Sequence, residues 1–206
     1  MIALIDYDAG NIRSVEKALQ FLGHETVTTR DKELLLSAEK VILPGVGSFG
    51  DCMEKLHSFG LIPVIGEIVN KGTPFFGICL GLQLLFESSE EAPGVPGLGL
   101  LPGKIRRIPA AEGLKIPHMG WNSLHLMNNG RLFQDIPEQS YVYFVHSFYL
   151  EAADLSIVKA TAEYGVTIHA SVEKDNIFGC QFHPEKSGEL GLQILQNFAG
   201  KEGGAC

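Results

Sequence analysis

The sequence lacks the features that would place it in a membrane or on a nucleic acid. Its 206 residues contain no apolar run of the ~20 residues that a bilayer-spanning helix needs. The segment Met1–Asp6 has neither the basic region nor the cleavage site of a secretory signal, so we expect a cytoplasmic protein. The formal net charge of −8 argues against nucleic acid as the main partner. What is left is a chain with 45% apolar and 19% charged residues, the balance of an ordinary globular protein.

Cysteine is scarce: its spacing gives no sign of a zinc site, and without a secretory signal we do not expect disulfides. The four cysteines are Cys52, Cys79, Cys180 and Cys206. None belongs to a Cys-x-x-Cys pair, and the spacing matches no zinc-ligand pattern, so we expect reduced thiols, no metal and no cofactor. We interpret Cys52, Cys180 and Cys206 as small structural residues. Cys79 has a different context.

The order of expected elements predicts an α/β fold. Strands are expected at 2–5, 25–29, 41–43, 74–78, 104–108, 141–145, 157–162, 166–172 and 178–182. Helices are expected at 15–22, 31–36, 51–70 with a break near Gly60 and Pro63, 80–87 and 190–198. The alternation in the first half predicts a central, mostly parallel sheet flanked by helices, and the second half predicts additional antiparallel strands. We expect a single domain over 1–200 and a short tail at 201–206.

One cysteine lies in the pattern Gly77-Ile78-Cys79-Leu80-Gly81, between an expected strand and an expected helix. Gly-x-Cys-x-Gly is the cysteine counterpart of the nucleophile elbow. The nucleophile of an elbow sits on a tight, strained turn, so the residues two positions away must lack a Cβ. The turn also places the thiol at a helix N-terminus and leaves the Leu80 N–H free to face an oxyanion. The alternative is a buried structural cysteine beside two turn glycines.

A cysteine nucleophile needs a base and a group that orients the base. Of the seven histidines, His183 follows an apolar strand, at the edge where open α/β sheets keep their sites. Glu185 lies two residues further and projects to the same side of an extended chain, where it can accept a hydrogen bond from the imidazole. His-Pro-Glu alone fits a surface turn, but beside an elbow it favours a triad of Cys79, His183 and Glu185.

The segment Pro44-Gly45-Val46-Gly47 ends another expected strand. Such a loop can offer backbone N–H groups to an anion. We predict a second oxyanion donor at Val46 or Gly47, opposite the Leu80 N–H. Losing one donor typically costs about 10²–10³ in rate. An ordinary strand-to-helix turn is the alternative.

The segments Gly77–Gln83 and His183–Glu185 resemble the class I, or triad, glutamine amidotransferase family, and the likeness runs from Ile2 to the last expected helix. The resemblance implies hydrolysis of glutamine to glutamate and ammonia through a γ-glutamyl thioester on Cys79. It also implies that Gln83 contacts the substrate and that Gly47 lines its pocket.

Further segments resemble one branch of this family, which supplies ammonia to a (β/α)₈-barrel cyclase in histidine biosynthesis. These segments are 6–12, 44–49, 118–122, 143–149 and 182–187. The branch implies a heterodimer in which the cyclase forms imidazole glycerol phosphate and aminoimidazole carboxamide ribotide. It also places Asn11, Trp121 and Lys186 near the partner surface.

Other roles in these segments are less specific. The only tryptophan, Trp121, can instead be a core residue. His118 is expected in a turn, and Tyr143 and His146 are expected to support the site without being catalytic.

Three alternatives stay open at this point. Triad glutaminases of anthranilate, GMP, carbamoyl phosphate or pyridoxal phosphate synthesis would share the triad, but are not expected to carry segment 118–122 as written. A cysteine hydrolase on a similar fold is opposed by Gln83 and by the closeness of His183 to Glu185. A non-catalytic binding module is opposed by the intact triad.

Overall fold

The computed structural model describes residues 1–8 and 12–200. Its strands are β1 (Ile2–Ile5), β2 (Thr26–Thr29), β3 (Lys40–Gly45), β4 (Phe75–Cys79), β5 (Ser88–Ser89), β6 (Gly103–Arg107), β7 (His118–Ser123), β8 (His125–Leu126), β9 (Tyr141–His146), β10 (Phe148–Ala152), β11 (Val158–Glu163), β12 (Thr167–Lys174) and β13 (Ile177–Cys180). Its helices are α1 (Ile12–Phe21), α2 (Lys32–Ser37), α3 (Phe49–Ser58), α4 (Leu61–Asn70), α5 (Leu80–Leu84) and α6 (Gly188–Ala199), with short 3₁₀ turns η1 (Arg131–Phe133), η2 (Leu155–Ile157) and η3 (Pro184–Lys186).

The central sheet has a parallel part and an antiparallel part. Its strand order is β2-β1-β3-β4-β13-β12-β11-β8. The first five strands of this order, from β2 to β13, pair in parallel with their neighbours. The remaining pairs, from β13 through β12 and β11 to β8, are antiparallel. Strand β13 is therefore the junction between the two parts. The predicted mostly parallel sheet with antiparallel strands in the second half is confirmed.

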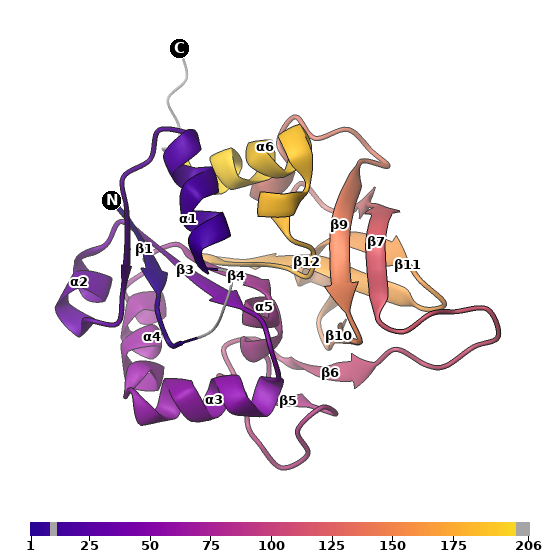
Figure 1. The fold of residues 1–206 in the computed structure, drawn as a ribbon, viewed down its shortest axis with the longest axis horizontal. Coiled ribbons are helices and arrows are strands. Elements are labelled where there is room, and N and C mark those ends of the chain that lie inside the picture. Colours follow the sequence, from indigo (N-terminus) through magenta and orange to yellow (C-terminus); the bar gives the residue numbers. More distant parts are fainter. Residues whose placement is uncertain (9–11, 201–206) are drawn as a thin grey trace.

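Helices cover both faces of this sheet (Figure 1). Their apolar side chains form two cores with those of the strands. Helices α2, α3, α4 and α5 pack on one face, and α1 and α6 pack on the other. Strand β1 shows how the alternation of side chains serves both cores: Ala3 and Ile5 enter the first, and Ile2 and Leu4 enter the second. A parallel sheet needs this double coverage because its strands are apolar on both sides.

Helix ends follow the local chemistry of the sequence. Asp31 caps α2 by accepting a hydrogen bond from the Leu34 N–H at 3.0 Å. Gly60, with φ of 63°, separates α3 from α4, so the predicted break there is confirmed. Pro63 lies inside the first turn of α4, where its missing N–H would have had no helical partner. The predicted break near Gly60 and Pro63 therefore lies at Gly60, three residues before Pro63.

Several element ends differ from the prediction, including those of β3, α5 and β13. Pro44 and Gly45 belong to β3 instead of ending it, because the parallel register with β4 continues to the pair Gly45 and Cys79. Helix α5 ends at Leu84, short of 87, because the chain turns there to pair β5 with β6. Strand β13 ends at Cys180, short of 182.

Two smaller sheets complete the structure. Strands β7 and β9 form an antiparallel pair, which we call the β7–β9 ribbon, and β10, β6 and β5 form a three-stranded sheet. Strands β5, β7, β8 and β10 are additions to the predicted set. His118 is the first residue of β7 and is buried, so the prediction of a turn at His118 is wrong. Among the described residues, no helix has the length and apolar content to cross a bilayer.

Candidate active site

The nucleophile candidate occupies a strained turn between β4 and α5. Cys79 has φ of 56° and ψ of −110°, a conformation that L residues rarely adopt outside functional sites. A Cβ on Gly77 would lie 2.6 Å from the Gly81 carbonyl oxygen, and a Cβ on Gly81 would collide with the carbonyl oxygen of Leu43. The prediction that both neighbours must lack a Cβ is thus confirmed by their surroundings.

A pocket of about 350 Å³ opens over this turn. It is lined by Val46, Gly47, Cys79, Leu80, Gln83, Glu91, Pro117, Val145, His146, Ser147, Phe148 and His183. The structure therefore brings the predicted nucleophile, the predicted base and the predicted oxyanion and substrate residues to one cavity. Its volume lies within the range of small-molecule sites.

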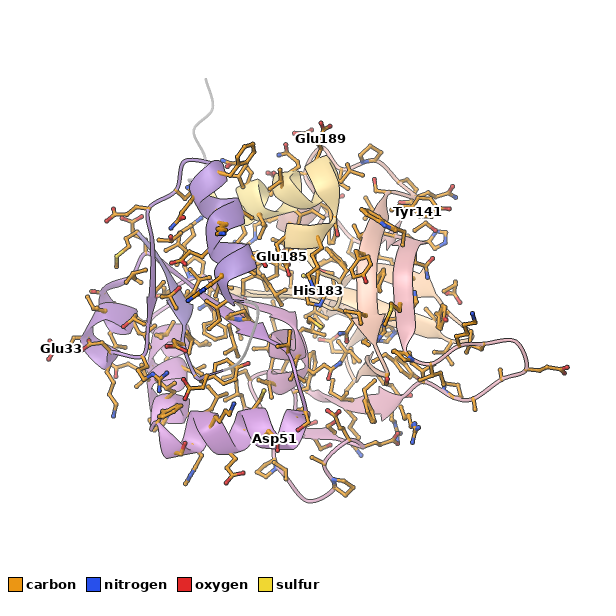
Figure 2. The ribbon with its side chains drawn as sticks, viewed as in Figure 1. Glu33, Asp51, Tyr141, His183, Glu185 and Glu189 are labelled. Atoms are coloured by element: carbon orange, nitrogen blue, oxygen red, sulfur yellow. The ribbon has the colours of Figure 1, made fainter. Side chains whose placement is uncertain are left out.

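His183 and Glu185 form a buried pair at η3. The ring Nδ1 lies 2.8 Å from Glu185 Oε1, and the two side chains are 2% and 0% exposed. Figure 2 shows both close together below α6. Burial alone would lower the pKa of His183, but polar contacts with Cys79 and Glu185, and the charges of both, raise it to about 9. The ring Nε2 is buried without another hydrogen bond of standard geometry among the described residues, which leaves it for proton transfer.

The predicted oxyanion loop lies directly against the elbow. Gly47 has φ of 104°, a conformation that glycine adopts readily. A Cβ on Gly45 would lie 2.6 Å from the Gly81 nitrogen, so the loop and the elbow touch through their backbones. The buried Tyr7 hydroxyl donates to the Pro44 carbonyl at 2.7 Å and fixes the start of the loop. Burial, together with Cys52 and Cys79, raises the pKa of Tyr7 well above its ordinary range, so the phenol stays protonated as a donor.

Gln83 lies on the pocket wall with its side-chain nitrogen already engaged. Its Nε2 donates to the Phe148 carbonyl at 3.0 Å and to Gln181 Oε1 at 2.9 Å. These bonds hold Gln83 in one orientation at the pocket.

Trp121 and Lys186, which were predicted at a partner surface, lie away from the pocket lining. Trp121 on β7 is 55% exposed, so its interpretation as a core residue is wrong. Its ring meets Tyr143 of β9 edge to face, with 6.2 Å between centroids. Lys186 ends η3 and is exposed. Asn11 lies outside the described residues.

Sequence reasoning missed part of the pocket. His146, which was expected to support the site, does line the pocket, whereas Val145, Ser147 and Phe148 beside it were not predicted there. All four fall in the segment 143–149 that the family resemblance singled out, so a signal for them existed. Gln181, which contacts the nucleophile sulfur, and Glu91, whose carboxylate accepts from the Phe49 N–H at 2.8 Å, had no signal of their own. The described residues contain no cluster of three or more His, Cys, Asp or Glu side chains able to hold a metal.

Comparisons with known proteins point the same way as this geometry. The sequence model of the glutamine amidotransferase class-I family matches residues 3–201. A protein of Bacillus cereus (strain G9842) described as imidazole glycerol phosphate synthase subunit HisH is 52% identical over 200 residues, which cover 97% of this chain and 94% of that protein. A HisH protein of Moorella thermoacetica is 49% identical over 197 residues, or 96% and 93% of the two chains.

Solved structures show the same fold at lower identity. A crystal structure of a glutamine amidotransferase superposes with a TM-score of 0.74 at 21% identity, covering 98% of this chain and all of the other. A glutamine amidotransferase of Thermotoga maritima gives 0.63 at 19% identity, covering 89% of this chain and 75% of the other. The family match and the close relatives together settle the classification: this chain belongs to the class I glutamine amidotransferases and, within them, to the HisH subunits of imidazole glycerol phosphate synthase.

Proposed function

We propose that this chain hydrolyses glutamine and passes the ammonia to the (β/α)₈-barrel cyclase subunit of imidazole glycerol phosphate synthase. The observation that carries the proposal is the positive φ of Cys79 in a pocket shared with His183, whose ring is held by Glu185. A nucleophile, a base and an orienting acid in this arrangement suit acyl transfer from an amide.

The first half of the reaction uses the triad and two backbone donors. The Cys79 sulfur attacks the side-chain amide carbon of glutamine as a thiolate, and the carbonyl oxygen becomes an oxyanion. We assign the oxyanion to the Leu80 N–H and to an N–H of the Val46–Gly47 loop, with Gln83 and Gly47 bordering the substrate. As the carbon–nitrogen bond breaks, His183 gives its proton to the departing ammonia, and a γ-glutamyl thioester remains on Cys79.

The second half returns the enzyme to its starting state. A water molecule loses a proton to His183 and attacks the thioester carbon, and the carbon–sulfur bond breaks to release glutamate. Glu185 supports both halves because its contact at Nδ1 directs Nε2 toward the reacting atoms. The raised pKa of His183, about 9, means that the ring carries the proton needed by the leaving nitrogen at neutral pH.

The second part of the proposal is the protein that receives the ammonia and the surface where it binds. We place the cyclase at a surface that includes Asn11, Trp121 and Lys186, in a heterodimer that forms imidazole glycerol phosphate and aminoimidazole carboxamide ribotide. The exposed indole of Trp121 supports this because tryptophan is enriched among interface anchors.

We also propose that 1–200 is the single catalytic domain, that 201–206 is a tail, and that the protein acts in the cytoplasm, where thiol nucleophiles stay reduced.

The test uses the complex with the barrel cyclase and two nitrogen sources. We expect Cys79→Ala to abolish synthesis from glutamine while synthesis from added ammonia stays at the wild-type rate. The isolated chain should show very low glutaminase activity, because a loop with two glycines can hold an N–H away from the site until a partner binds. Glutamine-dependent turnover by Cys79→Ala would overturn the proposal, and high activity without a partner would overturn the gating.

A further inference from the structure

A line of polar side chains crosses the molecule from the β7–β9 ribbon toward the pocket, starting at the half-buried Asn122. The Asn122 Oδ1 accepts from the Ser123 N–H at 2.8 Å, and its Nδ2 donates to the Glu163 carbonyl at 2.9 Å. Because a backbone N–H can only donate and a carbonyl can only accept, these bonds fix the orientation of the amide. The same Nδ2 lies 3.3 Å from His118 Nε2, which must therefore accept.

The donor-to-acceptor direction of these hydrogen bonds continues through the rings of His118 and His146. His118 Nδ1 lies 3.0 Å from His146 Nε2, and His146 Nδ1 lies 2.8 Å from the Phe148 carbonyl oxygen. The Phe148 carbonyl can only accept, so His146 carries its proton on Nδ1 and accepts at Nε2. His118 then carries its proton on Nδ1 as well. The constraint from Asn122 and the constraint from Phe148 give the same tautomers independently.

Both rings are neutral in this arrangement. A second proton on His146 would set its Nε2–H against the Nδ1–H of His118. Burial lowers the pKa of His118 to about 4. Burial also lowers the pKa of His146 to about 3, outweighing the hydrogen bond to the Phe148 carbonyl, which raises it, and the charges of His118 and His183 lower it further. His118 is stacked on Tyr164 with 3.8 Å between centroids, which leaves no room for a solvating shell on that face.

The line then reaches the nucleophile. The Phe148 carbonyl also accepts from Gln83 Nε2, and that nitrogen donates its second hydrogen to Gln181 Oε1 at 2.9 Å. Gln181 Nε2 in turn donates to the Cys79 sulfur at 3.7 Å. Gln181 is fully buried, and both polar atoms of its side chain have a partner within the protein.

We propose that Asn122, His118, His146, Gln83 and Gln181 form one positioning network that ties the β7–β9 ribbon to the Cys79 sulfur. Gln181 touches the reacting atom and is a further catalytic residue, whereas His118 and His146 are positioning residues that act through the Phe148 carbonyl. The inference rests on the proposed glutaminase function. A fully directed network has one arrangement of donors and acceptors, so it holds the pocket wall and the sulfur in one geometry.

The first test separates Gln181 from a merely structural residue. In the complex with the cyclase, Gln181→Met keeps the side-chain length and removes the donor to sulfur, so we expect kcat with glutamine to fall about tenfold. Gln193→Met, on the exposed face of α6, is the matched control and should leave kcat unchanged. Ammonia-dependent synthesis should stay at the wild-type rate in both variants.

The second test uses the conservative replacement of His146. His146→Gln keeps one donor and one acceptor, whereas His146→Phe keeps neither. We expect His146→Phe to raise KM for glutamine about three- to tenfold with a smaller change in kcat. His146→Gln should have a KM much closer to that of the wild type. Equal KM values in both variants would overturn the positioning role. A wild-type complex that uses ammonia but not glutamine would instead overturn the proposed function.

A third measurement needs no variant and so does not depend on a mutant folding. Ring ¹⁵N chemical shifts of the labelled wild-type chain distinguish the two neutral tautomers from each other and from the imidazolium. We expect both His118 and His146 to be neutral with the proton on Nδ1 near neutral pH. An Nε2–H tautomer or an imidazolium at either residue would overturn the network.

Discussion

The parallel part of the sheet and the β7–β9 ribbon treat polar side chains in opposite ways. In the parallel part the strands other than the edge strand β2 are mostly apolar, and the reactive groups lie where strands end: Cys79 closes β4, and His183 follows β13. In the ribbon, polar His118 and His146 are buried, while Met119 and Trp121 are exposed. The first arrangement is set by local backbone geometry, and the second depends on hydrogen bonds between residues far apart in the sequence.

The largest effect is expected where the two regions meet, at Glu185. We predict that Glu185→Gln lowers glutamine-dependent kcat in the complex by about 10³–10⁴-fold, because an amide no longer fixes the His183 tautomer or stabilises its charge. Steady-state kinetics of the complex check this. A loss below tenfold would mean that His183 is oriented by something other than this carboxylate.

A glycine of the elbow tests the claim that local backbone sets the nucleophile. We predict that Gly81→Ala lowers the free energy of unfolding by about 3 kcal/mol or more, because its Cβ would collide with the backbone of β3. Gly66→Ala in α4 is the matched control: it has open space around its Cα and should raise stability by roughly 0.5–1 kcal/mol. Denaturant unfolding measures the free energy of unfolding of both variants. Similar changes in the two would contradict the claim that the local backbone sets the nucleophile.

The ribbon's exposed face is tested by binding. We predict that Trp121→Ala weakens association with the barrel cyclase by about 2–4 kcal/mol, as for a central aromatic anchor. Phe21→Ala removes another exposed aromatic ring, at the end of α1, and should leave affinity unchanged. Calorimetric titration distinguishes the two. Equal losses, or none for Trp121, would move the partner surface elsewhere.

The buried His183 also predicts that the stability of the chain depends on pH. The pKa of His183 rises from an ordinary 6.5 to about 9 on folding, so its contribution is fully present below about 6.5 and is lost as pH rises through about 9. The wild-type chain should therefore lose about 1–3 kcal/mol more stability over this window than His183→Asn does. Denaturant unfolding at a series of pH values gives the difference. His125→Asn, at an exposed ring, should follow the wild type.

The contrast between the regions explains which parts of the fold the sequence could predict. Most elements of the parallel part were predictable because apolar strands, turn glycines and caps such as Asp31 carry their signals locally. Strand β7 was not, because apolar Met119 and Trp121 face outward while polar His118 faces inward. Periodicity analysis assumes that apolar residues face inward, so a strand with the reverse pattern gives it no signal. The other strand of the ribbon, β9, was predicted, and its apolar Val142 and Phe144 are buried.

The candidate site also has parts that neighbouring residues determine and parts that depend on contacts between distant residues. The elbow at Cys79 and the pair His183 and Glu185 are encoded over a few neighbouring residues, so their spacing predicted their proximity. Gln181 reaches the Cys79 sulfur only because β13 pairs with β4 in a particular register. Such a contact depends on sheet order, which local sequence does not contain.

The central claim, that Cys79 is the nucleophile for a glutamine amide, is tested most directly by covalent trapping. The complex would be treated with a glutamine analogue that carries an electrophilic diazoketone in place of the amide, and the modified peptide would be identified by mass spectrometry. The account predicts one adduct, on Cys79, whose formation glutamine prevents and Glu185→Gln slows. An adduct on Cys52 or Cys180, or an active complex that forms none at Cys79, would contradict it.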